Sequence, residues 1–256
     1  MMKRLFILIA ALMFIWLICS SCAGEIIEEF PDDFESYTDP AAGPSDEDGV
    51  ADMLPSERKA MISRLNALSG YQGDDILDDR ELHFKYQPLE DGVSCRVMLY
   101  YGDRNDGCDV CVPEKLGGLT VAAIANSAFQ GRDYLESVEL PETVMLVDDM
   151  AFHQCSSLKS VKLNEGIVML GKSCFGGCVS LEELELPESL EIVGEFAFLQ
   201  CLKLHEIHFG ENLKEIRANA FVLCDSLKKI TIPRDAAVDE KAFTGIPEDT
   251  EIVFVE

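Results

Sequence analysis

The sequence predicts a solenoid of short parallel strands, because residues 124–256 are periodic with a repeat of about 23 residues. The repeat is marked by Ala-Phe pairs at Ala128-Phe129, Ala151-Phe152, Ala197-Phe198, Ala220-Phe221 and Ala242-Phe243, with Cys174-Phe175 in the remaining position. Each repeat also carries leucine-like residues in an L-x-x-L-x-L spacing, such as Leu181, Leu184 and Leu186. This combination is typical of a leucine-rich repeat solenoid. We therefore predict a mainly β fold whose stacked repeats share one core.

Composition limits the kind of partner that the protein can have. The 256 residues include 47 acidic and 21 basic ones, which gives a formal net charge of -26. A polyanion would be repelled over most of such a surface, so nucleic acid is not an expected partner. The apolar content of 48% is enough for a sizeable core.

The first 22 residues have the pattern of an export signal. Lys3 and Arg4 precede an apolar run over 5–18, and small residues follow it. The run is shorter than the roughly 20 apolar residues of a membrane span. The context of Cys22 resembles a bacterial lipoprotein signal, although Cys19 stands where leucine is usual. The resemblance implies lipidation of Cys22. It also implies a lipid-anchored protein on the bacterial cell surface or on the outer face of the cell membrane. Plain secretion and an uncleaved anchor are the alternatives.

Residues 23–55 form an acidic segment after this signal. From residue 25 to residue 57 there are twelve acidic residues, four prolines and no Lys or Arg. Like charges repel each other, and the few apolar side chains cannot offset the entropy of ordering the chain. We expect a solvated tether that holds the folded part away from a membrane.

Residues 56–112 are expected to cap the first repeats. Ser56 is a good helix N-cap and Gly70 a good terminator, which predicts one short helix between them. Strand-forming runs follow near 82–87, 93–101 and 108–112, separated by turn residues, and predict a small antiparallel meander. The repeats themselves then occupy 113–256. Residues 244–256 lack the repeat cysteine and are expected to close the other end of the stack.

His153 and Cys155 could in principle be a catalytic base and nucleophile. Cys155, however, recurs at the repeat spacing as Cys178, Cys201 and Cys224, whereas the equivalents of His153 are Gly, Leu and Val. A nucleophile has no reason to recur in every repeat, but a small buried side chain does. We therefore interpret the cysteines as core residues and expect no enzyme, cofactor or catalytic residue.

Cys95, Cys108 and Cys111 lie outside the repeat pattern. Cys108 and Cys111 form a C-x-x-C motif, which suits a metal or redox site, but no second pair of ligands accompanies them. One of them could instead form a disulfide with Cys95, or all three could remain free thiols. His205 and His208 do not complete a metal site, since residues three apart on a strand are expected on opposite faces.

The repeats resemble those of the BspA-type leucine-rich repeat family of surface proteins. The matching stretches include LEELELPESLEIVGEFAFLQC over 181–201 and LHEIHFGENLKEIRANAFVLC over 204–224. The stretch DVCVPEKLGGLTVAAIANSAF over 109–129 is similar to the family's entry segment. The resemblance covers about 108–256. It implies a protein of the bacterial cell surface, protein–protein contact and adhesion to host proteins, and no shared catalytic residues.

The outward positions of the repeat strands are the first candidate binding surface. Solenoids present concave strand faces to their partners. The residues expected on this face are Glu139, Lys162, Glu183, Glu185, Glu206, His208, Lys229 and Thr231. Neighbouring strands lie about 4.8 Å apart, so charges of alternating sign would also form a solvated ion-pair ladder, which is the alternative to a binding role. The acidic residues 183, 185 and 206 form a like-charge cluster that a cation or basic segment would relieve.

A second candidate surface is apolar. Met145 and Leu146 in one repeat and Val168 and Met169 in the next stand where a later repeat has Lys and Glu. Stacked Met and aliphatic side chains make an adaptable contact patch if they are exposed. The alternative is that the N-terminal meander covers them.

These observations favour a binding protein that recognises a protein partner. A structural envelope protein whose repeats pack against copies of itself is the alternative.

Overall fold

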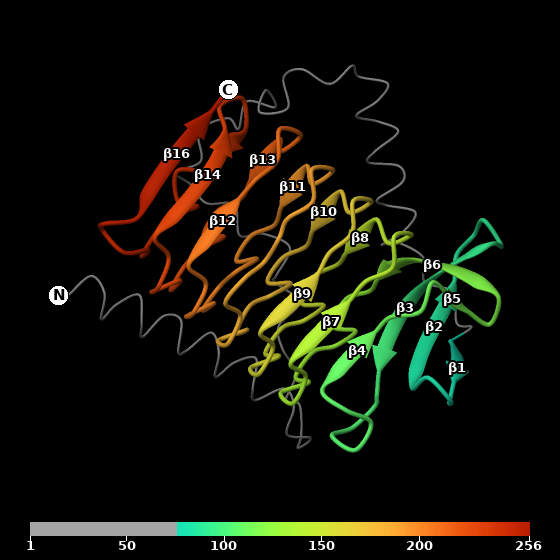
Figure 1. The fold of residues 1–256 in the computed structure, drawn as a ribbon. Helices are drawn as coiled ribbons and strands as arrows, with labels where there is room; N and C mark the ends of the chain where they lie inside the picture. The colour runs from blue at the N-terminus through green and yellow to red at the C-terminus, as the bar shows by residue number, and fades with distance from the viewer. Residues whose placement is uncertain (1–75) are drawn as a thin grey trace, which may run out of the picture. The chain divides into compact units, whose positions relative to one another are not determined.

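The structure is a computed structural model that describes residues 76–256, and within this range it contains strands but no helix (Figure 1). The expected export signal over 1–22, lipidation at Cys22, the tether over 23–55 and the helix that starts at Ser56 all lie outside the described residues. No helix within 76–256 is therefore long and apolar enough to cross a membrane.

The chain winds as a solenoid, and most of its turns add one strand to each of two rows (Figure 1). The first row consists of β4 (Asp109–Cys111), β7 (Ser137–Glu139), β9 (Ser160–Lys162), β12 (Glu206–His208), β14 (Lys229–Pro233) and β16 (Glu251–Val255). The second row consists of β6 (Leu119–Ile124), β8 (Leu146–Val147), β10 (Met169–Leu170), β11 (Ile192–Val193), β13 (Glu215–Ile216) and β15 (Ala237–Val238), with β5 (Lys115–Leu116) beside β6. We call the outward side of the first row the strand face.

The register of both rows confirms the predicted repeat. Val138 lies beside Val161 and Ile207 beside Ile230, and in the second row Val147 lies beside Leu170. Each pair is 23 residues apart and parallel. The turn over 181–186 contributes only a single bridge, between Ser160 and Glu183, so the first row is divided into two three-stranded sheets.

A column of aromatic rings runs along the core. Phe129, Phe152, Phe175, Phe198 and Phe221 are fully buried, and successive rings are stacked with centroids 4.9–5.8 Å apart. One ring per turn at a constant position gives each turn an apolar contact with the next. This column is the structural reason for the Ala-Phe periodicity.

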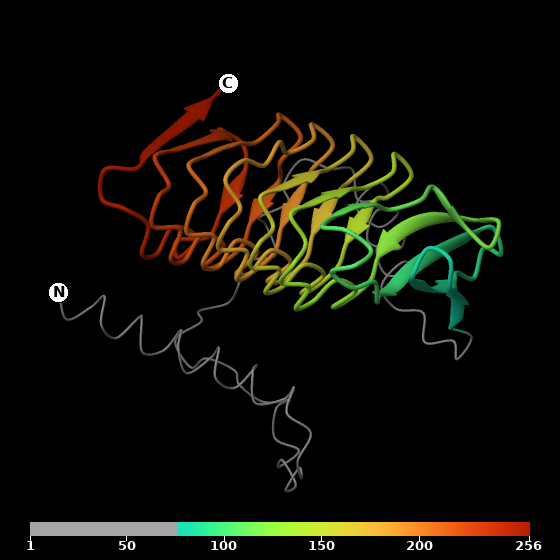
Figure 2. The ribbon, with the colours of Figure 1, turned by 60° about the horizontal axis from the view of Figure 1, so that its bottom comes forward.

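The turns that join the strands repeat as regularly as the core does (Figure 2). From Ser127 to Asn219, the residue before each Ala-Phe pair, and before Cys174-Phe175, has a positive φ, as in Met150 (53°) and Phe196 (55°). The residue before the repeat cysteine also has a positive φ, as in Gln154 (61°), Gly177 (77°) and Gln200 (58°). Each of these turns therefore contains two residues in the left-handed conformation, which we call left-handed corners. Most of these residues are not glycine.

An antiparallel meander covers the N-terminal end of the core. It consists of β1 (Leu77–Asp79), β2 (Phe84–Pro88) and β3 (Ser94–Tyr100), and β3 joins β6 of the solenoid in parallel. The rings of Phe84 and Tyr100 pack on Phe129 with centroids 6.2 and 5.4 Å away. These contacts continue the aromatic column into the meander, which acts as the predicted cap.

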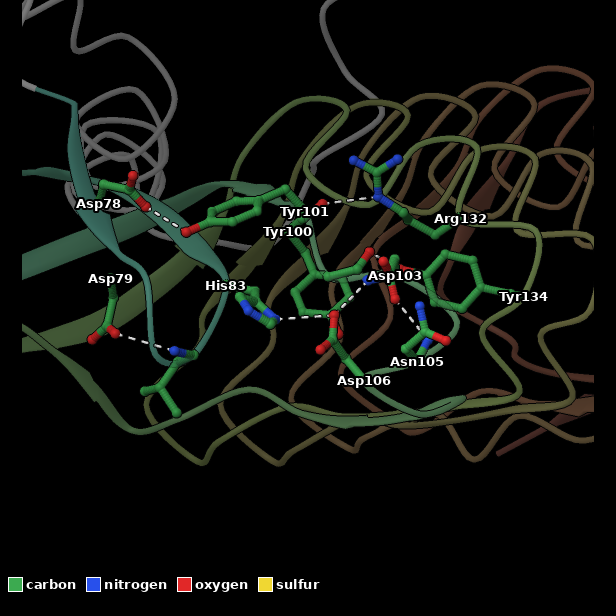
Figure 3. A network of polar contacts seen from close by, with 12 residues as sticks. Asp78, Asp79, His83, Tyr100, Tyr101, Asp103, Asn105, Asp106, Arg132 and Tyr134 are labelled. Atoms are coloured by element: carbon green, nitrogen blue, oxygen red, sulfur yellow. Dashed lines mark hydrogen bonds and ion pairs between the residues drawn. The ribbon is translucent and has the colours of Figure 1, made fainter.

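Polar contacts fasten the loop after β3 to the first turn (Figure 3). Arg132 donates from Nε to the Tyr100 carbonyl at 2.8 Å, and the Tyr134 hydroxyl donates to the Gly102 carbonyl. His83 lies 3.1 Å from the Asp106 carboxylate, and the Tyr101 hydroxyl donates to Asp78 at 2.7 Å.

Two expectations about the ends of the solenoid are wrong. The run at 108–112 is not part of the meander, because β4 pairs in parallel with β7 and is the first strand of the strand face. At the other end β16 does not close the stack. It extends the sheet by one strand and is itself an edge.

Candidate binding surface

The repeat cysteines are packing residues, as predicted. Cys155, Cys178, Cys201 and Cys224 are all fully buried. Each thiol donates a hydrogen bond of 3.1–3.3 Å to the carbonyl of the phenylalanine 26 residues earlier. Burial raises the pKa of Cys155 to about 12, so it is a thiol at neutral pH. His153 is also buried and makes no hydrogen bond with it.

The other four described cysteines, Cys95, Cys108, Cys111 and Cys174, are also free thiols in the structure. Cys95 is buried, and its thiol lies 3.8 Å from the Leu119 carbonyl. Burial raises its pKa to about 11. Cys111 is exposed on β4, at the N-terminal end of the strand face. Within residues 76–256 no group of three His, Cys, Asp or Glu side chains is arranged to hold a metal ion.

The strand face arises from the alternation of side chains along each strand of the first row. Val161, Leu184 and Ile207 point into the core, and their neighbours on both sides point outward. Of the predicted face residues, Glu139, Lys162, Glu183, Glu185, Glu206 and His208 are exposed, and Lys229 and Thr231 are half-buried.

The N-terminal half of this face is neutralised by ion pairs. Lys162 pairs with Glu139, and Lys159 pairs with Glu136 at 2.5 Å. The hydrogen bond and the charge of each carboxylate raise the pKa of its lysine. Here the charges of alternating sign do form the ladder that the sequence suggested.

The ladder ends in the middle of the strand face. Glu182 pairs with Lys203 at 2.8 Å rather than with Lys159. No ion pair or side-chain hydrogen bond involves Glu183 or Glu185 among the described residues. The centre of the face therefore carries carboxylates without a counter-charge.

Two open hollows meet at these carboxylates. One, of about 430 Å³, runs from β4 to Glu183 and Glu185 and is also lined by Ser137 and Ser160. The other, of about 500 Å³, continues from Glu183 and Glu185 to Glu206 and the two histidines 205 and 208. Together they extend from β4 to β12, and both are lined by Glu183 and Glu185.

Histidines border the second hollow. His208 Nε2 lies 3.4 Å from Glu206, and its Nδ1 lies 3.0 Å from the Thr231 hydroxyl. His205 precedes β12 instead of lying within it, and it lines the same hollow as His208. The expectation that the two rings lie on opposite faces is therefore wrong, because it assumed strand geometry at position 205.

The apolar candidate is largely covered. Leu146 is only 2% exposed and packs with Leu89 from the turn after β2. Met145 and Met169 are half-buried against the same cluster, and Val168 is half-buried beside Met169. The N-terminal cap therefore covers much of this surface, which removes Leu146 from any exposed patch.

Sequence reasoning missed some residues of the strand face. Asp109 and Cys111 line the first hollow. The run at 108–112 was predicted as a meander strand and not as part of the first row, since Val110 and Val138 are 28 residues apart instead of 23. Lys203 was missed because it reaches Glu182 from a turn and is not in the strand columns.

Comparison with known proteins agrees with this architecture. Residues 122–248 match the BspA type leucine rich repeat region in six copies. No curated protein matches the chain.

Three solved structures resemble the solenoid. The leucine rich repeat protein TpLRR of T. pallidum is 24% identical over 70% of this chain and 85% of that chain, with a TM-score of 0.58. A leucine rich cell surface protein of Faecalibacterium prausnitzii is 23% identical over 72% and 51%, with a TM-score of 0.57. The pneumococcal vaccine antigen PcpA is 22% identical over 73% and 51%, with a TM-score of 0.59.

The chain spans about half the length of the last two proteins. At these identities the likeness shows the fold. The repeat sequence identifies residues 122–248 as leucine-rich repeats of the BspA type.

Proposed function

We infer that this chain is a cell-surface protein that binds a protein partner through its strand face, with adhesion as the use of that binding. The observation that carries this proposal is the pair of unpaired carboxylates, Glu183 and Glu185, where the two hollows meet. The BspA-type repeats and the cell-surface description of one similar structure support the location. Leucine-rich repeat solenoids are typical scaffolds for protein interaction.

The electrostatics of the face favour a partner with basic groups. Like charges on neighbouring strands repel each other, and Glu183, Glu185 and Glu206 are three such charges on adjacent turns. A Lys or Arg of the partner laid across the centre of the face would supply the missing counter-charge. The ion pairs on the N-terminal side would then limit this attraction to the centre and fix the position of the partner.

The expected anchor and tether complete the proposal. Lipidation at Cys22 would hold the chain on a membrane, and residues 23–55 would separate it from the solenoid. A fully extended segment of that length spans at most roughly 120 Å. Its acidic residues would keep it away from the acidic strand face as well, because both carry the same sign of charge.

The test compares binding by the full chain and by a charge-reversed strand face. The full chain is immobilised in mild detergent and exposed to host matrix proteins, to serum and to a lysate of the parent cell envelope. A second sample carries Glu183→Lys, Glu185→Lys and Glu206→Lys together. We expect that a protein retained by the unchanged chain binds the triple variant with an affinity at least tenfold lower.

A matched control reverses three exposed charges elsewhere. Asp225→Lys, Asp235→Lys and Glu240→Lys give the same change in net charge and lie outside the strand face. If the control lowers affinity as much as the first triple variant, the effect is one of net charge and the strand face is not the site. If neither variant binds less, the partner uses another surface.

A further inference from the structure

The C-terminal end of the solenoid leaves part of its core uncovered. In the register of β14 and β16, Ile252 lies beside Ile230 and Phe254 beside Ile232. The two β14 residues are fully buried, whereas Ile252 is 36% exposed and Phe254 is 49% exposed. Register partners in a parallel pair point to the same side, so both exposed residues continue core columns that no turn within residues 76–256 covers.

The backbone edge of β16 that faces away from β14 also has no strand partner among residues 76–256. The Glu251 amide donates to the Lys228 carbonyl, and the Val255 carbonyl accepts from the Arg234 amide. In a parallel ladder this pattern turns residues 251, 253 and 255 toward β14 and turns the N–H and C=O groups of Ile252 and Phe254 toward the free edge. An edge with free groups and apolar side chains is a template for strand addition.

We propose that a second copy of this chain covers this end, with β16 paired antiparallel to β16 of the copy about a twofold axis at Val253. In that register Ile252 of each chain faces Phe254 of the other as a hydrogen-bonded pair. The backbone groups that point to the free edge belong to these two residues, so the exchange satisfies them on both chains.

The side chains and charges suit a copy of the same strand. The twofold register joins the two exposed core columns, with Ile opposite Phe twice, which is a favourable cross-strand pair. Glu251 falls opposite Val255 of the copy instead of opposite its own equivalent, so no carboxylates meet directly. Residues 228–256 carry four basic and seven acidic residues, a local excess of three against -26 for the whole chain. The strand is thus self-complementary, as a twofold interface requires.

The dimer has a functional consequence that rests on the proposed function. A twofold axis perpendicular to the joined sheet leaves both strand faces on the same side. Two identical faces would then bind a repetitive or multivalent partner with higher avidity than one face.

The test is a cross-link at the axis in the full chain. Val253 faces its own equivalent as a non-hydrogen-bonded pair, for which the Cα separation is about 4.5 Å and suits a disulfide. We expect Val253→Cys to give a covalent dimer under mild oxidation on a non-reducing gel. Thr231→Cys is the matched control, because it lies beside Val253 on the inner strand, and its two copies would be roughly 14 Å apart.

Both variants keep the same anchor and the same native cysteines, so any other cross-link appears equally in both. Phe254→Asp in the Val253→Cys background should reduce the covalent dimer at least tenfold, and the charge-reversed strand face should not. No covalent dimer, or equal amounts from Val253→Cys and Thr231→Cys, would overturn the proposal. The strand-face test is separate, because it measures the binding of a partner protein to the strand face and not the pairing of two copies at β16.

Discussion

At the scale of single residues, His153 is a polar side chain in an apolar place. It is 2% exposed, and neither ring nitrogen makes a hydrogen bond. Burial lowers its pKa below the usual 6.5, although the nearby Ser173 carbonyl opposes this in part. The unfolded chain therefore takes up a proton on this ring at a higher pH than the folded chain does. The free energy of unfolding is therefore unaffected by this ring above pH 6.5, and it decreases as the pH falls below 6.5.

We expect His153→Leu to raise the free energy of unfolding by about 1 kcal/mol and to flatten its decrease between pH 7 and pH 5. Leucine fits, because the equivalent position of a later turn holds the buried Leu199. Urea denaturation across this pH range measures both effects. His205→Gln is the control, since His205 is exposed and this change removes no buried ring. An unchanged slope in His153→Leu would show that other groups cause the acid sensitivity.

The left-handed corners give a second prediction for single residues. A Cβ added at Gly177 would lie 3.3 Å from Gln154 Cγ, and its φ of 77° is unfavourable for other residues. We expect Gly177→Ala to lower the free energy of unfolding by roughly 1–2 kcal/mol. Gln200→Ala changes the same corner in the next turn, which already carries a side chain at φ 58°, and should cost far less. Equal losses in urea denaturation would contradict this account.

At the scale of elements, the N-terminal cap depends on few contacts with the first turn. The Tyr134 hydroxyl donates to the Gly102 carbonyl, and burial raises the pKa of this tyrosine to about 12. We expect Tyr134→Phe to cost about 1 kcal/mol and to speed hydrogen exchange in residues 100–107 without affecting later turns. Tyr101→Phe removes an exposed hydroxyl of the same cap and should have a smaller effect. Faster exchange throughout the solenoid would show that the cap does not open by itself.

Elements also show where sequence reasoning succeeded and where it failed. The strands of the repeats were predictable, because residues such as Val161 and Ile230 recur at a fixed spacing and a stack requires the same position in each turn. The strand at 108–112 was also predicted, but its place in the first row was not, since its spacing to β7 differs from 23 residues. The left-handed corners were not predictable either, because Met150 and Phe196 are not residues that favour this conformation, and neighbouring turns impose it.

The same distinction applies to the strand face. Which residues point outward followed from the alternation of the strand, but which charges pair did not. Lys203, which lies in a turn, forms the ion pair with Glu182. Lys159 therefore pairs with Glu136 instead of with Glu182. The position of a turn side chain depends on three-dimensional packing that a one-dimensional column of residues does not contain.

At the scale of the whole molecule, the solenoid is a one-dimensional stack with unequal ends. The N-terminal end is covered by the aromatic rings of the meander, whereas the C-terminal end exposes Phe254 and has the half-buried Phe243 as its last stacked ring. In such a stack each turn is stabilised only by its neighbours. A defect in the middle should therefore separate two halves of different stability.

Phe175→Ala tests this asymmetry in the central turn. Removing the buried ring should cost roughly 3–5 kcal/mol and interrupt the aromatic column between Phe152 and Phe198. We expect the C-terminal half, residues 198–256, to exchange its amide hydrogens before the capped half, residues 84–152, when followed by mass spectrometry in increasing urea.

The comparison is made in the Phe254→Asp background, so that the proposed pairing of two copies at β16 does not protect the C-terminal half. Phe243→Ala in that background is the control, because a defect at the last turn should loosen only residues near it. Simultaneous exchange of both halves in Phe175→Ala would mean that coupling between turns survives the lost ring. The second strand row, whose backbone ladder is unbroken from β6 to β15, would then hold the stack together more than the aromatic column does.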